Sequence, residues 1–198
     1  MNLYATKAAL NLRLAPLVDR MATAGVAPDA VTLAALPVAV AGGACILGSP
    51  AVPALLLGVP LLAGLRLVLN LLDGSLARRT GRMHGRGELY NEVGDRLADV
   101  AFLAPAAFVP GASMPVVLVG VLIGVLASYV GVAARAAGGD RIYRGVLSKP
   151  GRMVLVGACA IAAFVAGPQA WGVFGPLLLA GTTLTLIERL VVALRRLP

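Results

Sequence analysis

The sequence predicts an all-α integral membrane protein, in which six transmembrane helices are preceded by an N-terminal interfacial amphipathic helix. Two observations predict this fold class: the composition of the chain and the alternation of charged and uncharged connections along it. Of the 198 residues, 59% are hydrophobic and only 13% are charged, whereas soluble domains are about 45–50% apolar and about 25% charged. Because a soluble core of this size cannot hide so much apolar sequence, we expect lipid to cover much of the protein.

Six apolar stretches account for the predicted spans. They cover residues 31–47, 52–72, 97–109, 116–134, 153–166 and 174–194. Several of them need flanking residues to reach the ~20 residues that a bilayer requires. The connections after the first, third and fifth stretches contain no Lys or Arg. Apart from two arginines inside the stretches, the positive residues occupy the N-terminus, the other two connections and the C-terminus. The positive-inside rule therefore predicts an inner, cytoplasmic membrane protein with both termini and both charged loops in the cytoplasm.

The chain is expected to form a single membrane domain over residues 1–198, with residues 1–24 as the interfacial helix and residues 25–198 as the six-helix bundle. Leucines in the first segment recur at roughly helical spacing, which favours a helix lying on the cytoplasmic face of the membrane. A disordered leader is the alternative interpretation of this segment. Pro28 and Asp29 then open the first span, with Asp29 near its N-cap.

The net charge of +8 is interpreted as a cytoplasmic collar that meets the anionic headgroups of membrane lipids. Nucleic acid is not an expected partner, because the basic residues lie in short loops between spans and form no recognisable binding module. Cys45 and Cys159 lie inside apolar runs without a spaced Cys or His partner. A zinc site is therefore not expected, and both cysteines are interpreted as small buried side chains.

One segment, residues 70–99, breaks the apolar pattern with carboxylates and amides. On a helix, Asn70, Asp73 and Ala77 share one face, and Asn91, Asp95 and Asp99 share a face of the next helix, with Glu88 one turn earlier. Two helices joined by a short loop are antiparallel neighbours, so these two polar faces can meet. We therefore expect a cluster of carboxylates and amides near the cytoplasmic surface.

This cluster has the chemistry of a metal site for a phosphate compound. Acidic groups gathered in one place repel one another unless a cation lies among them. Oxygen ligands without His or Cys suit Mg²⁺, Mn²⁺ or Ca²⁺ rather than zinc. Gly74 and Gly87 lack side chains and let a ligand approach the backbone closely, and the flanking arginines suit phosphate.

The same residues resemble the motif D-x2-D-G-x2-A-R-x8-G-x3-D-x3-D of the CDP-alcohol phosphotransferase family. Positions matching the motif at its spacing are Asp73-Gly74, Ala77-Arg78, Gly87 and Asp95. A Pro-x-x-x-Thr element from Pro28 to Thr32 opens the first span, as in the family. The first and third motif aspartates are replaced by Asn70 and Asn91, so the four positions carry a charge of −2 instead of −4. The motif covers residues 70–95, while the topology of six spans resembles the family over the whole chain.

The resemblance implies a metal-dependent enzyme of phospholipid biosynthesis. It would move a phospho-alcohol group, such as phosphatidyl, from a CDP-alcohol such as CDP-diacylglycerol to the hydroxyl of a small or lipid alcohol, with release of CMP. Asp95 would be the general base, and one or two Mg²⁺ or Mn²⁺ ions would be held by Asp73, Asn70, Asn91, Asp95 and Asp99. Gly74, Ala77, Arg78 and Gly87 would bind the nucleotide and its phosphates, and Arg135, Lys149 and Arg144 would bind the acceptor.

The sequence also suggests roles for residues outside the motif. Arg82 is a further candidate for contact with phosphate, and His84 is interpreted as a solvated loop residue. Arg66, inside the second span, is expected to pair with Asp99 or Glu92. The family commonly forms homodimers, and a homodimer is expected here too. The small residues Gly120, Gly124 and Ser128 at four-residue spacing form a pattern that such an interface can use.

Two alternative functions remain open. The loss of two motif charges favours a catalytically impaired protein that binds a CDP-alcohol, or a partner subunit. The retained Asp73, Asp95 and both motif glycines argue against that loss of activity. An unrelated carrier or cation transporter would also place acids within spans. The sequence contains no inverted repeat of the kind such transporters use, and its acids cluster at one face.

Overall fold

The computed structural model describes residues 3–81 and 85–197, and the side chains from residue 12 onward in those ranges. Within them the chain forms seven α-helices and three short 3-10 helices. The α-helices are α1 (Leu3–Thr23), α2 (Pro28–Gly48), α3 (Gly58–Thr80), α4 (Gly85–Leu103), α5 (Met114–Ala136), α6 (Lys149–Ala166) and α7 (Phe174–Arg196). The 3-10 helices are η1 (Pro53–Leu57), η2 (Ala104–Phe108) and η3 (Pro168–Val173).

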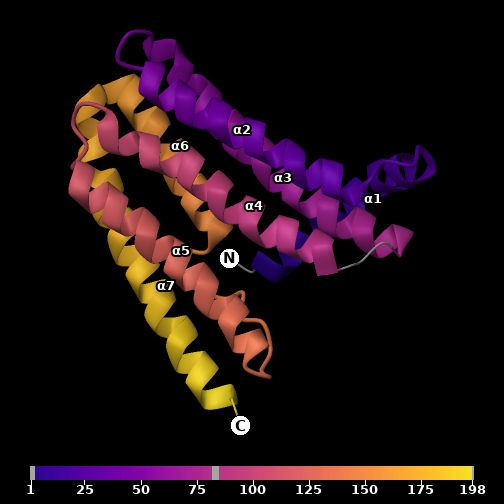
Figure 1. Ribbon diagram of the computed structural model, residues 1–198. Coiled ribbons are helices and arrows are strands. Elements are labelled where there is room, and N and C mark those ends of the chain that lie inside the picture. The colour runs from indigo at the N-terminus through magenta and orange to yellow at the C-terminus, as the bar shows by residue number, and fades with distance from the viewer. Residues whose placement is uncertain (1–2, 82–84, 198) are drawn as a thin grey trace.

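The helices pack in two groups that share one core (Figure 1). In the first group, α2 packs against both α3 and α4, and α1 lies against α3. In the second group, α5 and α7 pack along each other. Helix α6 lies between the two groups: it packs mainly against α3 of the first and also contacts α7 of the second. A helix does form over Leu3–Thr23, and its position at the membrane surface remains a prediction.

The ends of the helices follow from local sequence. Helix α2 begins at Pro28, whose fixed φ suits the first turn of a helix, and Asp29 in the same turn complements the helix dipole. The N-cap itself is Ala27 rather than Asp29. Helix α3 ends at Gly81, which has a φ of 66° and adopts the left-handed conformation that glycine tolerates. Helix α3 therefore stops just after the first half of the motif, Asn70 to Arg78, and the second half lies on α4.

Five helical segments of the described residues are long and apolar enough to cross a membrane. They are Pro28–Gly48, Pro53–Thr80, Met114–Ala136, Lys149–Ala166 and Pro168–Arg196. The third predicted span, residues 97–109, corresponds to the second half of α4 and to η2. Helix α4 is absent from this set because it carries charged residues on most of its turns. A crossing by α4 and η2 therefore remains a prediction.

Glycines on α2 allow α4 to lie close to it. A Cβ added at Gly42 would overlap the ring of Phe102, and one at Gly43 would overlap the backbone carbonyl oxygen of Ala101. Phe102 is fully buried in the main core. This close approach fixes α4 beside α2 and brings its polar residues opposite those of α3.

The small residues of α5 serve packing inside the chain. A Cβ at Gly120 would come within 3.1 Å of Leu178, and one at Gly124 within 3.2 Å of Thr182, both on α7. The Thr182 hydroxyl also donates a hydrogen bond of 3.1 Å to the carbonyl oxygen of Gly120. Helix α7 therefore covers these two glycines, while Ser128, the third residue of the pattern, is half-buried and donates to the carbonyl oxygen of Gly124.

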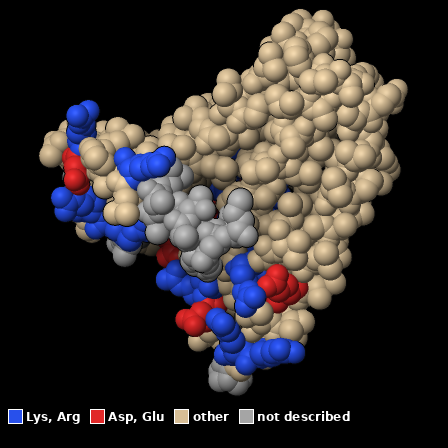
Figure 2. Space-filling view, turned by 180° about the vertical axis from the view of Figure 1, so that it is seen from behind, with Lys and Arg blue, Asp and Glu red and all other residues tan. Residues whose placement is uncertain are grey.

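The surface divides into a charged end and an apolar remainder. Figure 2 shows Lys, Arg, Asp and Glu gathered toward one end of the molecule, while most of the rest of that face is free of them. Large hydrophobic side chains are exposed along α2, for example Leu33, Val40 and Leu47, which are 58%, 53% and 50% exposed. Such a surface fits contact with lipid, in agreement with the predicted membrane class.

Candidate functional site

The facing sides of α3 and α4 bring the four motif positions together. Asn70 on α3 donates from Nδ2 to Oδ1 of Asp95 on α4, at 2.8 Å. Asn91 on α4 donates from Nδ2 to Oδ2 of Asp73 on α3, at 3.1 Å. Each of the two amides thus contacts a carboxylate of the other helix, and the four residues form two neighbouring pairs, here together called the motif cluster.

Asp73 is the most buried member of the motif cluster, with 3% of its surface exposed. Besides Asn91, its Oδ2 accepts a hydrogen bond of 3.1 Å from the hydroxyl of Thr32 on α2, and its Oδ1 accepts one of 2.5 Å from the N–H of Gly74. Thr32 belongs to the Pro-x-x-x-Thr element, so this element joins the cluster. Within the described residues, no Lys or Arg forms an ion pair with Asp73.

Asp95 is paired with a cation from a different helix. Lys149, the first residue of α6, lies with its Nζ 2.5 Å from Oδ1 of Asp95. Arg96 is more distant, with Nη1 4.0 Å from Oδ2. Oδ1 of Asp95 therefore accepts hydrogen bonds from both Asn70 and Lys149.

Asp99 lies one turn further along α4, between two buried arginines. Its Oδ1 is 2.6 Å from Nη2 of Arg66, and its Oδ2 is 2.5 Å from Nη2 of Arg152. We call these three residues the ion triad. The expected pairing of Arg66 with Asp99 is confirmed. Asp99 had been expected among the metal ligands, but each of its carboxylate oxygens is bound by a guanidinium, which already compensates its charge.

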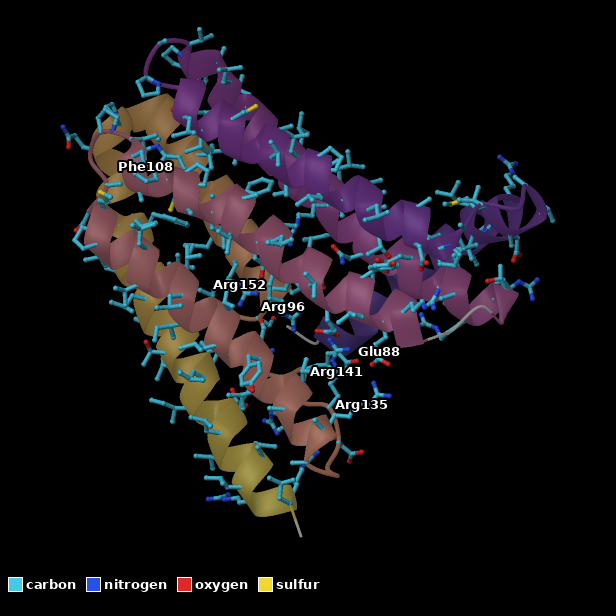
Figure 3. All side chains as sticks on the ribbon, in the orientation of Figure 1. Glu88, Arg96, Phe108, Arg135, Arg141 and Arg152 are labelled. Atoms are coloured by element: carbon cyan, nitrogen blue, oxygen red, sulfur yellow. The ribbon has the colours of Figure 1, made fainter. Side chains whose placement is uncertain are left out.

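The residues expected at the acceptor site are all paired with carboxylates. Arg135 pairs with Glu88, Arg144 pairs with Glu188 at 2.8 Å, and Lys149 pairs with Asp95. Figure 3 shows Glu88, Arg96, Arg135, Arg141 and Arg152 in the half of the molecule away from Phe108, where α4 and α5 face each other. Two of the three acceptor candidates, Arg135 and Lys149, therefore contact α4, the helix that carries Asn91 and Asp95 of the motif cluster.

A hollow of about 550 Å³ opens beside the loop between α5 and α6. Its lining includes Arg141, Tyr143, Arg144, Glu188 and Arg196. Of the acceptor candidates only Arg144 lines it. Three of these five side chains are cationic, so the hollow is suited to an anionic group.

The expected nucleotide residues lie on both sides of the turn between α3 and α4. Arg78 is exposed and donates to the hydroxyl of Ser75 at 3.2 Å. A Cβ at Gly74 would meet only Nη1 of Arg78, at 3.5 Å, so packing of the chain itself does not require glycine there. Ala77 lies one turn beyond Gly74 on α3, and Gly87 lies in the first turn of α4. Arg82 and His84 lie outside the described residues.

The motif cluster fits a divalent cation bound by oxygen. Oδ1 of Asn70 is buried and has no hydrogen-bond partner, although its amide nitrogen is bound to Asp95. An unpaired buried acceptor is costly, and amide and carboxylate oxygens are ligands that Mg²⁺ and Mn²⁺ accept. In the described part of the chain, no three His, Cys, Asp or Glu residues gather into a metal site. This follows from the amides at two of the four motif positions.

Sequence reasoning missed two buried arginines. Arg152 belongs to the ion triad, and Arg189 on α7 donates to three backbone carbonyl groups, those of Ala127, Tyr143 and Arg144, at 2.8, 3.1 and 2.9 Å. Arg189 thereby fixes the loop that carries Arg144. Its position inside an apolar stretch was the available signal, because a charge within a span needs a partner.

Comparisons with known proteins agree with this architecture. No model of a known protein family matches the chain. The inner membrane protein YnbA of Escherichia coli is 31% identical over 162 residues, which cover 82% of this chain and 80% of that protein. The crystal structure of Mycobacterium tuberculosis phosphatidylinositol phosphate synthase PgsA1 with CDP-DAG bound has a TM-score of 0.75 at 22% identity, and the match covers 91% of this chain and 93% of that one.

A second PgsA1 structure, in complex with manganese and citrate, has a TM-score of 0.75 at 21% identity, with 91% of this chain and 88% of that chain covered. At this level of identity the similarity establishes the fold. The helices are arranged as in PgsA1.

Proposed function

This chain belongs to the family of the Escherichia coli inner membrane protein YnbA, and we propose that it is a CDP-alcohol phosphotransferase of the inner membrane. It transfers a phospho-alcohol group, phosphatidyl when the donor is CDP-diacylglycerol, to the hydroxyl of a small or lipid alcohol in phospholipid biosynthesis. The acceptor oxygen bonds to the phosphorus attached to the donated alcohol, the bond from that phosphorus to CMP breaks, and CMP leaves.

The observation that carries this proposal is the pair of contacts across α3 and α4. Asn70 with Asp95, and Asp73 with Asn91, unite all four motif positions in one cluster at the charged end of the molecule. The shared fold with PgsA1, which binds CDP-DAG and has been seen with manganese, supports the same class of substrate and metal.

Asp95 acts as the general base in this proposal. Its carboxylate accepts the proton of the acceptor hydroxyl as the new bond to phosphorus forms. Asp73, Asn70, Asn91 and Asp95 are the residues from which the oxygen ligands of Mg²⁺ or Mn²⁺ would be drawn. A bound divalent ion neutralises charge on the phosphates and on the leaving CMP. Asp99 is left out of this set because of its two arginine partners.

The two substrates approach the motif cluster from different sides. Gly74, Ala77, Arg78 and Gly87 contact the nucleotide and its phosphates near the turn between α3 and α4. Arg135 near the end of α5, Arg144 in the loop that follows and Lys149 at the start of α6 attract the acceptor. Lys149 already contacts Asp95, so an acceptor held there lies next to the base.

A second candidate is a CDP-alcohol-binding protein without turnover, alone or as a partner subunit. The amides at positions 70 and 91 favour it, because they leave the described residues without a group of three acidic metal ligands. A homodimer remains a prediction, and no surface is assigned to it.

The decisive test measures CMP release from cytidine-labelled CDP-diacylglycerol by the purified protein in mixed micelles. Mg²⁺ or Mn²⁺ is titrated, and pooled acceptors such as glycerol phosphate, inositol phosphate, serine and lipid alcohols are added. We expect metal-dependent release that Asp95→Asn lowers about 10²–10⁴-fold, since an amide takes up no proton. Asp140→Asn, an exposed loop change, should retain full release. CDP-diacylglycerol binding without release under any condition would favour the second candidate.

A further inference from the structure

The negative charges of three aspartates are compensated in different ways. Two of them, Asp73 and Asp95, belong to the motif cluster, and the third, Asp99, belongs to the ion triad. Asp99 is bound by both Arg66 and Arg152. Asp95 is bound by Lys149 at 2.5 Å. Asp73 is bound only by neutral hydrogen-bond donors, those of Thr32, Gly74 and Asn91. Among the described residues, Asp73 is thus the one of the three without a cation of the chain.

We infer that Lys149 acts as a built-in cation in place of one metal ion at Asp95, so that the site binds a single divalent ion, held by Asp73 and the amide oxygen of Asn70. The inference rests on the proposed function and deepens it. It assigns Lys149 the role of a positioning residue that acts through Asp95.

The first argument is the saturation of one carboxylate oxygen. Oδ1 of Asp95 accepts a hydrogen bond of 2.8 Å from Asn70 and one of 2.5 Å from Lys149. A carboxylate oxygen has two lone pairs, so both are used by these donors. Oδ2 of Asp73 is likewise filled, by Thr32 and Asn91, but Oδ1 of Asp73 accepts only from the N–H of Gly74 and keeps one lone pair. A metal ion at this oxygen would have to displace one donor and then lie beside the ammonium group, which repels it.

The second argument is that the ammonium group is held in place by the fold. Lys149 and Arg152 lie three residues apart in the first turn of α6, and Asp95 and Asp99 lie four residues apart on α4. The ion pairs Lys149–Asp95 and Arg152–Asp99 therefore follow one another along the same sides of these two helices. The Lys149 side chain is only 20% exposed. The more deeply buried ion pair, Arg152–Asp99, holds the start of α6 near α4.

The third argument concerns the oxygen that remains without a partner. Oδ1 of Asn70 is buried and accepts no hydrogen bond, and Asn70 lies one turn from Asp73 on the same face of α3. An amide oxygen beside a carboxylate without a cation offers one site for a hard divalent ion. The amides at positions 70 and 91 also remove the two charges that a second divalent ion would need nearby.

The test counts bound Mn²⁺ per chain by electron paramagnetic resonance on the purified protein in detergent. We expect one ion for the native chain and for Lys149→Arg, which keeps the cation. We expect two ions for the double variant Asn70→Asp, Lys149→Met, which adds a carboxylate and removes the cation. Its matched control, Asn70→Asp with Lys149→Arg, should stay at one ion, because it has the same added carboxylate and still carries a cation.

Two ions bound to the native chain would overturn the inference, and this result needs no variant to fold. A double variant that stays at one ion while it elutes as the native protein does would also overturn it. CMP release from the same samples separates this inference from the proposed function. Two ions with CMP release would refute only the role of Lys149, and one ion without CMP release would support that role while refuting the enzyme.

Discussion

At the scale of single residues, replacing Gly74 tests whether a glycine is needed there for ligand binding, since packing of the chain does not require one. In Gly74→Ala the new Cβ meets only the end of the Arg78 side chain at 3.5 Å. Replacing a glycine inside a helix by alanine stabilises it by about 0.5–1 kcal/mol. We therefore expect a protein of equal or higher thermal stability that binds CDP-diacylglycerol at least ~10-fold more weakly, a loss of about 1.4 kcal/mol, as measured by equilibrium binding in micelles.

Gly64→Ala is the matched control for this change. Gly64 lies on the same helix, and a Cβ there meets nothing within 4 Å. It should raise stability by a similar amount and leave binding unchanged. Unchanged binding in Gly74→Ala would show that the nucleotide does not approach this position, and Gly74 would lose its proposed role.

At the scale of elements, the ion triad joins α3, α4 and α6. In Asp99→Asn, the Arg66 and Arg152 side chains, which are 0% and 3% exposed, lose their carboxylate. Breaking a buried ion pair by removing one partner costs about 3–5 kcal/mol, so we expect a large fall in the free energy of unfolding in detergent. Asp19→Asn breaks the exposed pair with Arg79 and should cost about 0–1 kcal/mol.

A further change tests whether the two arginines are the reason for that loss. Adding Arg152→Met to Asp99→Asn removes one of the two uncompensated charges and should recover part of the stability. Equal stability of Asp99→Asn and the native protein would show that the triad does not hold the three helices together.

The contact between α2 and α4 supplies a second test at this scale. Gly42→Ala places a Cβ into the ring of Phe102, and overpacking of a filled core costs about 1–3 kcal/mol. We expect lower thermal stability and lower CMP release, because α4 carries Asn91 and Asp95. Adding Phe102→Leu makes room for the new methyl group and should restore part of both. A Gly42→Ala protein as stable as the native one would contradict the close packing of these helices.

At the scale of the whole molecule, the alternation of charged connections predicts the side of the membrane on which each loop lies. Helix α5 runs from Ser113, its exposed N-cap, to Ala137, its exposed C-cap. In a chain with both native cysteines replaced by alanine, we expect Ser113→Cys in intact spheroplasts to react with a membrane-impermeant maleimide. Ala137→Cys should react only after the membrane is permeabilised. The opposite pattern would reverse the predicted orientation, and reaction of both in intact spheroplasts would contradict a crossing by α5.

The sequence by itself determined the features that depend on local pattern. Apolar runs of sufficient length predict membrane helices wherever they occur, and five such segments form in the described chain. The spacing of Asn70 and Asp73, and that of Asn91 and Asp95, follows the repeat of a helix and predicted which residues share a face. Since a short loop joins the two helices, their contact could also be expected before the structure was known.

The tertiary structure alone decided which distant residues complete the cluster. Lys149 reaches Asp95 from 54 positions away, Arg152 reaches Asp99 from 53, and Thr32 reaches Asp73 from 41. It also decided that Gly120 and Gly124 face α7 and not a second copy of the chain. The physical reason is that an ion pair or a close helix contact depends on how whole helices are placed against one another. That placement is set by the packing of α2 against α3 and α4 and of α6 against α3, whereas the local pattern specifies only which side chains each helix presents.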